Sequence, residues 1–365
     1  MAFEEVAEPG SGEDGASPAT WPTVTLVFLV YNRREELRTS LRAMLVDSDY
    51  PRDRVDVIVV DNASEDGSSD MVREEFPDVR VIRREVNCGI SGWNDGFAVA
   101  QGEWVLALDD DCHLPPDGLR RAMLAAREHQ VDLVSFGVTT PFDTTYRFNH
   151  SYLTGLLSFW GCAVLMHRRV LEALRGFDPE IFVWAHELEF MLRFFDAGFR
   201  HLHEPDILAL HLKDPGSGDW RGYIRTRAYK INIENFCYIA GKLLQTRDAA
   251  EAFIAVLATA LRDAAREDRA AMNAVLPAIR GFARGLRKRS PVRRAVVSQT
   301  YRRNFHSFAS PWWLSRPVSE IVAEAPGRLT ARALRRPREQ PPGRRDAYLE
   351  ERARYYPDST ATLEM

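Results

Sequence analysis

Three consecutive carboxylates, Asp109-Asp110-Asp111, directly follow the apolar segment Trp104–Leu108. Neighbouring acids repel one another unless a cation neutralises them. Mg²⁺ and Mn²⁺ prefer oxygen ligands, and they bind where the protein supplies few ligands and phosphate groups complete the shell. The run therefore favours a divalent-metal site that serves a diphosphate over a solvated turn.

Strand-like and helix-like segments alternate from Val24 onward, which predicts a doubly wound, mostly parallel α/β sheet. The expected strands are Val24–Val30, Val55–Val60, Val79–Ile82, Trp104–Leu108 and Val131–Phe136. Ligands of such sheets bind beyond the carboxyl ends of the strands. Polar residues follow three of these strands, at Tyr31-Asn32-Arg33, at Asp61-Asn62-Ala63-Ser64 and at the three acids. We therefore expect the site along that edge.

The later segments are mixed and then helical. Phe159–Met166 is expected to be a strand, Glu187–Ala197 a helix, and Phe199–Leu212 two short strands around Glu204-Pro205. Beyond Trp220 the apolar spacing is helical, and Ala249–Ala265 is a long amphipathic helix.

Glycine placement separates the nucleotide-binding folds. A dinucleotide-binding fold places GxGxxG directly after its first strand, but the segment here is YNRREEL, without glycine, and no P-loop occurs. The glycines lie instead in NCGISGWNDG, Asn87–Gly96, after the third expected strand.

Five segments in this order resemble the inverting family 2 glycosyltransferases of the GT-A fold, including rhamnosyl- and galactofuranosyltransferase-like members. The resemblance covers about half the chain, and its pieces are VFLVYNRREEL, VDVIVVDNASEDGSS, NCGISGWNDGFAVAQGEWVLALDDD, GFDPEIFVWAHELEFMLRFFDAGFR and the later His211. It implies a hexosyl- or deoxyhexosyltransferase that uses a UDP- or dTDP-sugar together with Mn²⁺ or Mg²⁺.

The resemblance also implies roles on the donor side. Asp61 matches the carboxylate that accepts from the nucleotide base, and Asn32, Asn87 and Asn94 match residues of the nucleotide pocket. Asp109 and Asp111 match the DxD pair, of which one holds the metal and the other reaches ribose or metal. Asp110 matches a residue that contributes to the ribose contact, and His211 matches a residue that serves as an additional metal ligand.

Aligned on Arg193, the family's catalytic acid falls at Glu187, and the acid before it is replaced by His186. Glu187 would take the proton of an acceptor hydroxyl, with Glu189 as the alternative base. Trp160 and Trp184 would stack on sugar rings at the acceptor side. The departure at His186 leaves open a second hypothesis, a catalytically degenerate sugar-nucleotide-binding or scaffold protein.

Composition and cysteine content indicate the class of protein and its cellular compartment. The apolar share of 45% and the net charge of -4 are those of a globular protein, and four scattered cysteines suit a reducing compartment. The N-terminal segment is acidic and unlike a signal peptide, so we expect a cytoplasmic protein. We expect a disordered acidic tail over 1–21, a GT-A domain over 22–215, a partly basic helical region over 216–325 and a loosely ordered Arg/Pro-rich tail over 326–365.

Charge in the helical region raises the question of partners. Arg280–Arg303 carries nine bases and no acid, and Pro311-Trp312-Trp313-Leu314 follows it. Cations beside interfacial aromatics suit either a solvated helix face or peripheral contact with the inner face of an anionic membrane, where a lipid-linked hydroxyl acceptor would lie. Nucleic-acid binding is not expected, because no known module accompanies the charge.

Overall fold

The computed structural model describes residues 21–141, 143–148, 159–212, 225–266, 269–294 and 296. The segments expected to be tails, 1–21 and 326–365, lie outside these residues except for Trp21. Pro311-Trp312-Trp313-Leu314 and the last part of Arg280–Arg303 also lie outside them.

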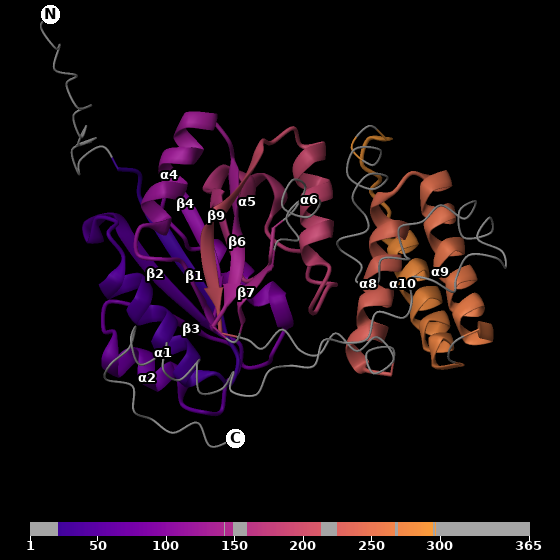
Figure 1. Cartoon of the computed structure of the whole chain (residues 1–365), viewed down its shortest axis with the longest axis horizontal. Helices are drawn as coiled ribbons and strands as arrows, with labels where there is room; N and C mark the ends of the chain where they lie inside the picture. Colours follow the sequence, from indigo (N-terminus) through magenta and orange to yellow (C-terminus); the bar gives the residue numbers. More distant parts are fainter. Residues whose placement is uncertain are drawn as a thin grey trace, which may run out of the picture.

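A nine-stranded sheet forms the centre of the α/β domain, in the order β3-β2-β1-β4-β8-β6-β9-β5, with β7 paired to β6 (Figure 1). Its strands are β1 Val24–Val30, β2 Val55–Asp61, β3 Arg80–Arg83, β4 Trp104–Asp109, β5 Cys112–His113, β6 Leu133–Thr140, β7 Asp143–Phe148, β8 Ala163–His167 and β9 His201–His211.

Half of this sheet follows the prediction, and half departs from it. Strands β3, β2, β1 and β4 are parallel neighbours, as expected from the alternation of strand-like and helix-like segments. The other half is mixed, because β8 enters between β4 and β6 and runs antiparallel to both. The expected break at Glu204-Pro205 does not divide the last segment. One strand, β9, spans it, and its register with β6 shifts between Phe136 and Gly137.

Along the sequence, the helices of this domain alternate with its strands. They are α1 Arg34–Arg42, which continues into a π-helical turn at Ala43–Asp47, α2 Ser68–Glu75, α3 Trp93–Phe97, α4 Gly118–His129, α5 Arg168–Leu174 and α6 His186–Asp196. Short 3-10 turns occur at Arg52–Arg54 and Gly89–Gly92.

Strand order places a crevice at the expected edge. The chain builds outward from β1 through β2 to β3 and then returns to the other side of β1 with β4. Ligands of open α/β sheets bind outside the carboxyl ends of the strands at such a reversal. Register brings these ends together, because Val30 pairs with Asp61 and Leu29 with Asp109.

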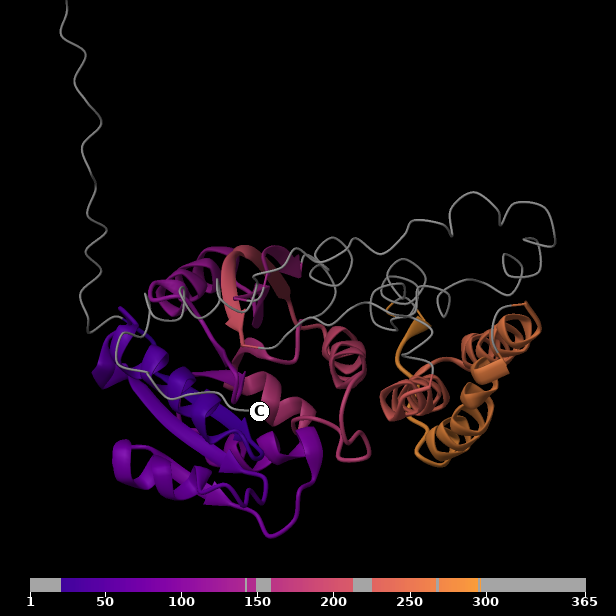
Figure 2. The ribbon, with the colours of Figure 1, turned by 60° about the horizontal axis from the view of Figure 1, so that its bottom comes forward.

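The C-terminal helices are α8 Arg227–Leu243, α9 Thr246–Arg266 and α10 Val275–Arg287, with a 3-10 turn at Arg269–Ala274. They gather to one side of the sheet, with α8 nearest to α6 (Figures 1 and 2). Their apolar core also takes in Ile181, Leu188 and Leu192 from the α/β domain. No helix in the described part of the chain combines the length and apolar character that a membrane span requires.

Candidate active and metal site

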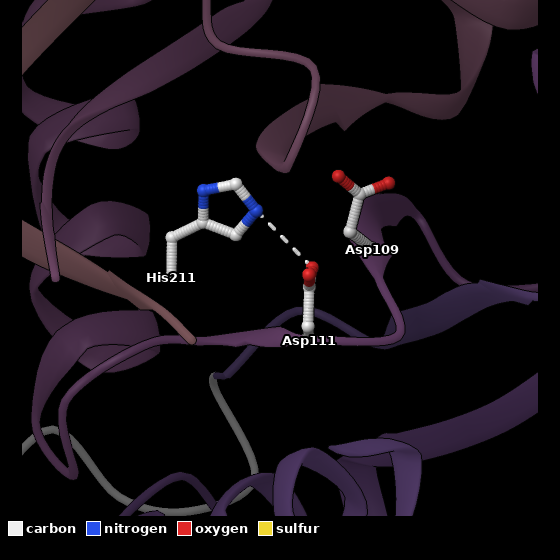
Figure 3. A group of neighbouring side chains, drawn as sticks. All are labelled: Asp109, Asp111 and His211. Atoms are coloured by element: carbon white, nitrogen blue, oxygen red, sulfur yellow. Dashed lines mark ion pairs between the residues drawn. The ribbon is translucent and has the colours of Figure 1, made fainter. Parts of the chain in front are cut away.

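Asp109, Asp111 and His211 converge beyond the end of β4 (Figure 3). Asp109 is the last residue of β4, and His211 is the last residue of β9. The short strand β5 pairs Cys112 with His211, which brings the imidazole beside Asp111. Nε2 of His211 lies 3.2 Å from Oδ1 of Asp111, and one ligand atom from each of the three residues lies within 4.8 Å of the others.

This donor set fits a divalent cation. Two carboxylates and one imidazole supply three ligand atoms, and Asp111 is buried while Asp109 and His211 are partly accessible. Hard divalent ions accept carboxylate oxygens and leave open positions for phosphate oxygens or water. The residues present would therefore hold such an ion at the edge where a diphosphate is expected.

Asp110 faces a different set of partners. Its Oδ2 accepts from the backbone N–H of Tyr31 at 3.2 Å, and its Oδ1 lies 3.3 Å from Nη1 of Arg33. Burial and the neighbouring charge of Asp111 raise the pKa of Asp110 to about 7, against the opposing effect of Arg33. Arg33 also contacts Asp111. Arg33 was not selected from the sequence, although its position directly after the first strand indicated it.

One cavity of about 480 Å³ is lined by the three candidate metal ligands, called the three-residue metal group below, and by most of the remaining expected site residues. Its lining includes Arg33, Asn62, Asn87, Asp109, Asp110, Asp111, Trp160, Trp184, His186, Glu187 and His211. The expected metal ligands, the expected base and both expected acceptor-side tryptophans therefore lie around the same space.

Glu187 lies in the first turn of α6, and two groups approach its carboxylate. Oε1 accepts from the backbone N–H of Gly161 at 3.2 Å, and Oε2 lies 3.3 Å from Nδ1 of His186. Burial lowers the pKa of His186, although Glu187 and Glu189 oppose the shift. The imidazole therefore stands neutral at pH 7.

Three expected nucleotide-pocket residues are not among those lining the cavity. Asp61 is 0% exposed, and its carboxylate accepts from the backbone of Ser64 at 2.7 Å and from the hydroxyl of Ser69. Asn94 exchanges two hydrogen bonds of 2.8 Å with the backbone of Phe177. In this structure these side chains hold loops beside the crevice, and their expected contacts with the nucleotide stay predictions.

Asn32 and Glu189 also lie elsewhere than expected. Asn32 is exposed, and its side chain accepts from the backbone N–H of Glu65 at 2.7 Å. Glu189 is 0% exposed and forms ion pairs with Arg193 and Lys242. Glu187 lines the cavity and Glu189 does not, so Glu187 stays the predicted base.

Asn62 lines the cavity, although the sequence analysis did not select it as a site residue. Its amide donates to Oδ1 of Asn87 at 2.9 Å and to the carbonyl of Gly89 at 3.0 Å, and its Oδ1 accepts from the backbone of Cys88 at 3.0 Å. The loop after β2 thereby fixes the glycine-containing loop, and Asn87 is kept at the cavity.

Comparison with known proteins agrees with this arrangement. The model of "Glycosyl transferase family 2" matches residues 25–200. Poly(ribitol-phosphate) beta-glucosyltransferase of Bacillus spizizenii is 32% identical over 115 residues, which cover 30% of this chain and 18% of that protein. Glycosyltransferase AglE of Haloferax volcanii is 24% identical over 212 residues, or 54% of this chain and 69% of that protein.

Among solved structures, a mannosyltransferase from Pyrobaculum calidifontis, in complex with GDP-Man and Mn²⁺, aligns with a TM-score of 0.49 and 23% identity. The alignment covers 74% of this chain and 88% of that one. The chain thus spans under a fifth of the Bacillus relative and most of the archaeal ones. The family model on residues 25–200, just under half of the chain, and the sheet described above identify this segment as a glycosyl transferase family 2 domain with a GT-A fold.

Proposed function

We propose that this protein transfers a sugar from a nucleotide-sugar donor to a hydroxyl group, with inversion at the anomeric carbon and with a divalent cation as cofactor. The observation that carries the proposal is that a three-residue metal group and the carboxylate of Glu187 line one cavity inside the family 2 domain. Neither group alone would specify transfer. Together they offer a place for a diphosphate and a base for the acceptor.

On the donor side, Asp109, Asp111 and His211 would hold the cation. A bound cation supplies positive charge against the negative charge that develops on the departing nucleoside diphosphate. Arg33 lies beside the same acids with 41% of its side chain exposed, so its guanidinium is available to a phosphate oxygen. UDP- and dTDP-sugars are the proposed donors.

On the acceptor side, Glu187 would remove the proton of the hydroxyl as its oxygen attacks the anomeric carbon. The sugar–oxygen bond to the diphosphate breaks on the opposite face, which inverts the centre. The backbone N–H of Gly161 orients the carboxylate, and neutral His186, 3.3 Å away, adds no second charge beside it. Trp184, which is 37% exposed, and Trp160 offer aromatic faces to sugar rings.

A lipid-linked acceptor is supported by the outer face of α10. Leu276, Ile279 and Leu286 are exposed there, and their spacing of three and seven residues places them on one side of the helix. Arg280 and Arg287 flank that side. An apolar stripe with flanking cations suits an anionic bilayer surface. Sedimentation with phosphatidylglycerol vesicles, reversed by salt, would support peripheral contact, and a protein that stays in the supernatant at low salt would contradict it.

The alternative is a protein that binds a sugar nucleotide without turnover. A thermal-shift panel of nucleotide sugars, GDP-mannose included, with and without Mn²⁺, addresses binding. A ligand at 100 times its Kd stabilises a folded protein by about 2.7 kcal/mol. We expect one donor to raise the Tm only when Mn²⁺ is present.

Turnover decides between the two functions. We expect slow release of nucleoside diphosphate from that donor in the wild type, and loss of this release in Glu187→Gln. Metal-dependent binding without any turnover, across many hydroxyl acceptors, would favour the scaffold.

A further inference from the structure

We propose that helix α8 braces the cavity wall beside Glu187, with Asn235 as the positioning residue that fixes the backbone before α6. The inference rests on the proposed function for its catalytic consequence. Its structural part stands on contacts between α8 and the segment 178–189.

Residues 178–189, called the wall segment below, form much of the acceptor side of the cavity. Phe182, Val183 and Trp184 line it just before α6, and His186 and Glu187 follow in the first turn. Trp184 and Ala185 have φ values of 61° and 60°, so two consecutive non-glycine residues occupy the left-handed region. The left-handed region is unfavourable for residues with a β-carbon, so contacts from outside the segment must hold them.

Asn235 supplies such contacts from α8. Its Nδ2 donates to the carbonyl of Val183 at 2.7 Å and to the carbonyl of Trp184 at 3.1 Å. An amide nitrogen has two N–H groups, and both are used here. Asn235 is 3% exposed, so an apolar replacement would leave two carbonyls without these donors in a place that water reaches poorly.

Two further residues of α8 anchor both ends of the wall segment. The Tyr238 hydroxyl donates to Oδ2 of Asp178 at 2.7 Å, and Nζ of Lys242 lies 2.6 Å from the same oxygen. Lys242 also lies 2.8 Å from Oε1 of Glu189 in α6. Burial alone would raise the pKa of Asp178, but the hydrogen bonds from Lys242 and Tyr238 lower it, so the carboxylate stays ionised.

Spacing shows that these contacts belong to one face. Asn235, Tyr238 and Lys242 stand at positions i, i+3 and i+7, which share a side of an α-helix. Apolar packing of Ile181 and Leu188 against Ile233 and its neighbours surrounds the polar contacts. The C-terminal helical region is therefore part of the site. It contacts Asp178 at the start of the wall segment, the backbone of Val183 and Trp184, and Glu189 in the helix that carries Glu187.

The test uses the full chain and four variants. Asn235→Leu keeps the branched shape of the side chain and removes both donors. Glu234→Gln changes the adjacent residue, whose partners are Arg280 and Arg284 of α10, not the wall. Lys242→Met removes the anchoring charge, and Lys242→Arg restores a cation.

Amide exchange of residues 182–187, measured by mass spectrometry, reports the brace without any need for activity. We expect exchange to be at least tenfold faster in Asn235→Leu and to stay at the wild-type rate in Glu234→Gln. For transfer, we expect kcat to fall at least tenfold in Asn235→Leu while KM for the nucleotide sugar stays within twofold, because the residues around Asp109 are untouched. Lys242→Met should follow the same pattern, with recovery in Lys242→Arg.

Wild-type exchange together with wild-type kcat in Asn235→Leu would overturn the inference. If Asn235→Leu does not fold, the Lys242 pair decides by the same two readouts. If Asn235→Leu exchanges faster but the wild type transfers no sugar, the contact between α8 and the wall segment is upheld. The same result refutes the proposed function.

Discussion

Substitution of Gly161 by alanine tests the placement of Glu187. A β-carbon at this position would lie 2.8 Å from Oε1 of Glu187 and 2.7 Å from Cε1 and Nε2 of His186. Carbon contacts normally lie at about 3.5 Å, so the carboxylate or its loop must move by about 0.7 Å. A shift of about 1 Å can cost about 100-fold in rate. We therefore expect Gly161→Ala to lower kcat by about 10- to 100-fold, or about 1.4–2.7 kcal/mol of activation free energy.

The assay is initial-rate release of nucleoside diphosphate, with the Tm measured on the same samples. Gly198→Ala is the matched control. An added β-carbon there meets no atom within 4 Å, but its φ of +85° is unfavourable for alanine. The control should lower the Tm and leave kcat unchanged, whereas Gly161→Ala should lower kcat with little change in Tm. A Gly161→Ala protein with wild-type kcat would refute the account of how Glu187 is oriented.

Two further predictions concern stability. Because burial lowers the pKa of His186, the folded state binds its proton more weakly than the unfolded chain does, so the stabilisation is complete above a pKa of about 6.5 and is lost as the pH falls below it. Urea unfolding at pH 7.5 and pH 5 should therefore show a larger loss for the wild type than for His186→Phe, and equal losses would contradict this. In Gly285→Ala, the new β-carbon would lie 2.2 Å from the carbonyl oxygen of Tyr238, where α10 crosses α8. We expect the free energy of unfolding to fall by about 1–3 kcal/mol, and an unchanged urea midpoint would show that the two helices separate freely.

The parallel half of the sheet could be predicted from sequence because its strands are mostly apolar and three of them are followed by polar residues. Val24–Val30 was predicted with its observed bounds, and β4 extends one residue further than expected. The antiparallel insertion of β8 carries no local pattern, since a strand buried on both faces is apolar in either direction. The proline of β9 suggested a break, but the register shift opposite Gly137 absorbs it.

The site was predictable where charge density was unusual. Three adjacent acids favoured a cation site, the family resemblance selected Asp109, Asp111 and His211 as its ligands, and the structure brings these three side chains together. Asn94 could not be placed, because a side-chain amide gives no sign that its partner is a backbone 83 residues away. The contacts of Asn235 span 52 and 51 residues and depend on how α8 packs, which local patterns do not report.

The central claim is that the acids after β4 hold a cation that in turn holds a diphosphate. Titration of Mn²⁺ in the presence and absence of UDP, followed by the electron paramagnetic resonance of the free ion, tests it most directly. We expect UDP to tighten Mn²⁺ binding in the wild type, and Asp111→Asn and His211→Gln to weaken it by about tenfold or more. Asp110→Asn, whose carboxylate faces Tyr31 and Arg33, should retain Mn²⁺ affinity. Wild-type Mn²⁺ affinity in both Asp111→Asn and His211→Gln, or UDP binding that is indifferent to the metal, would contradict the account.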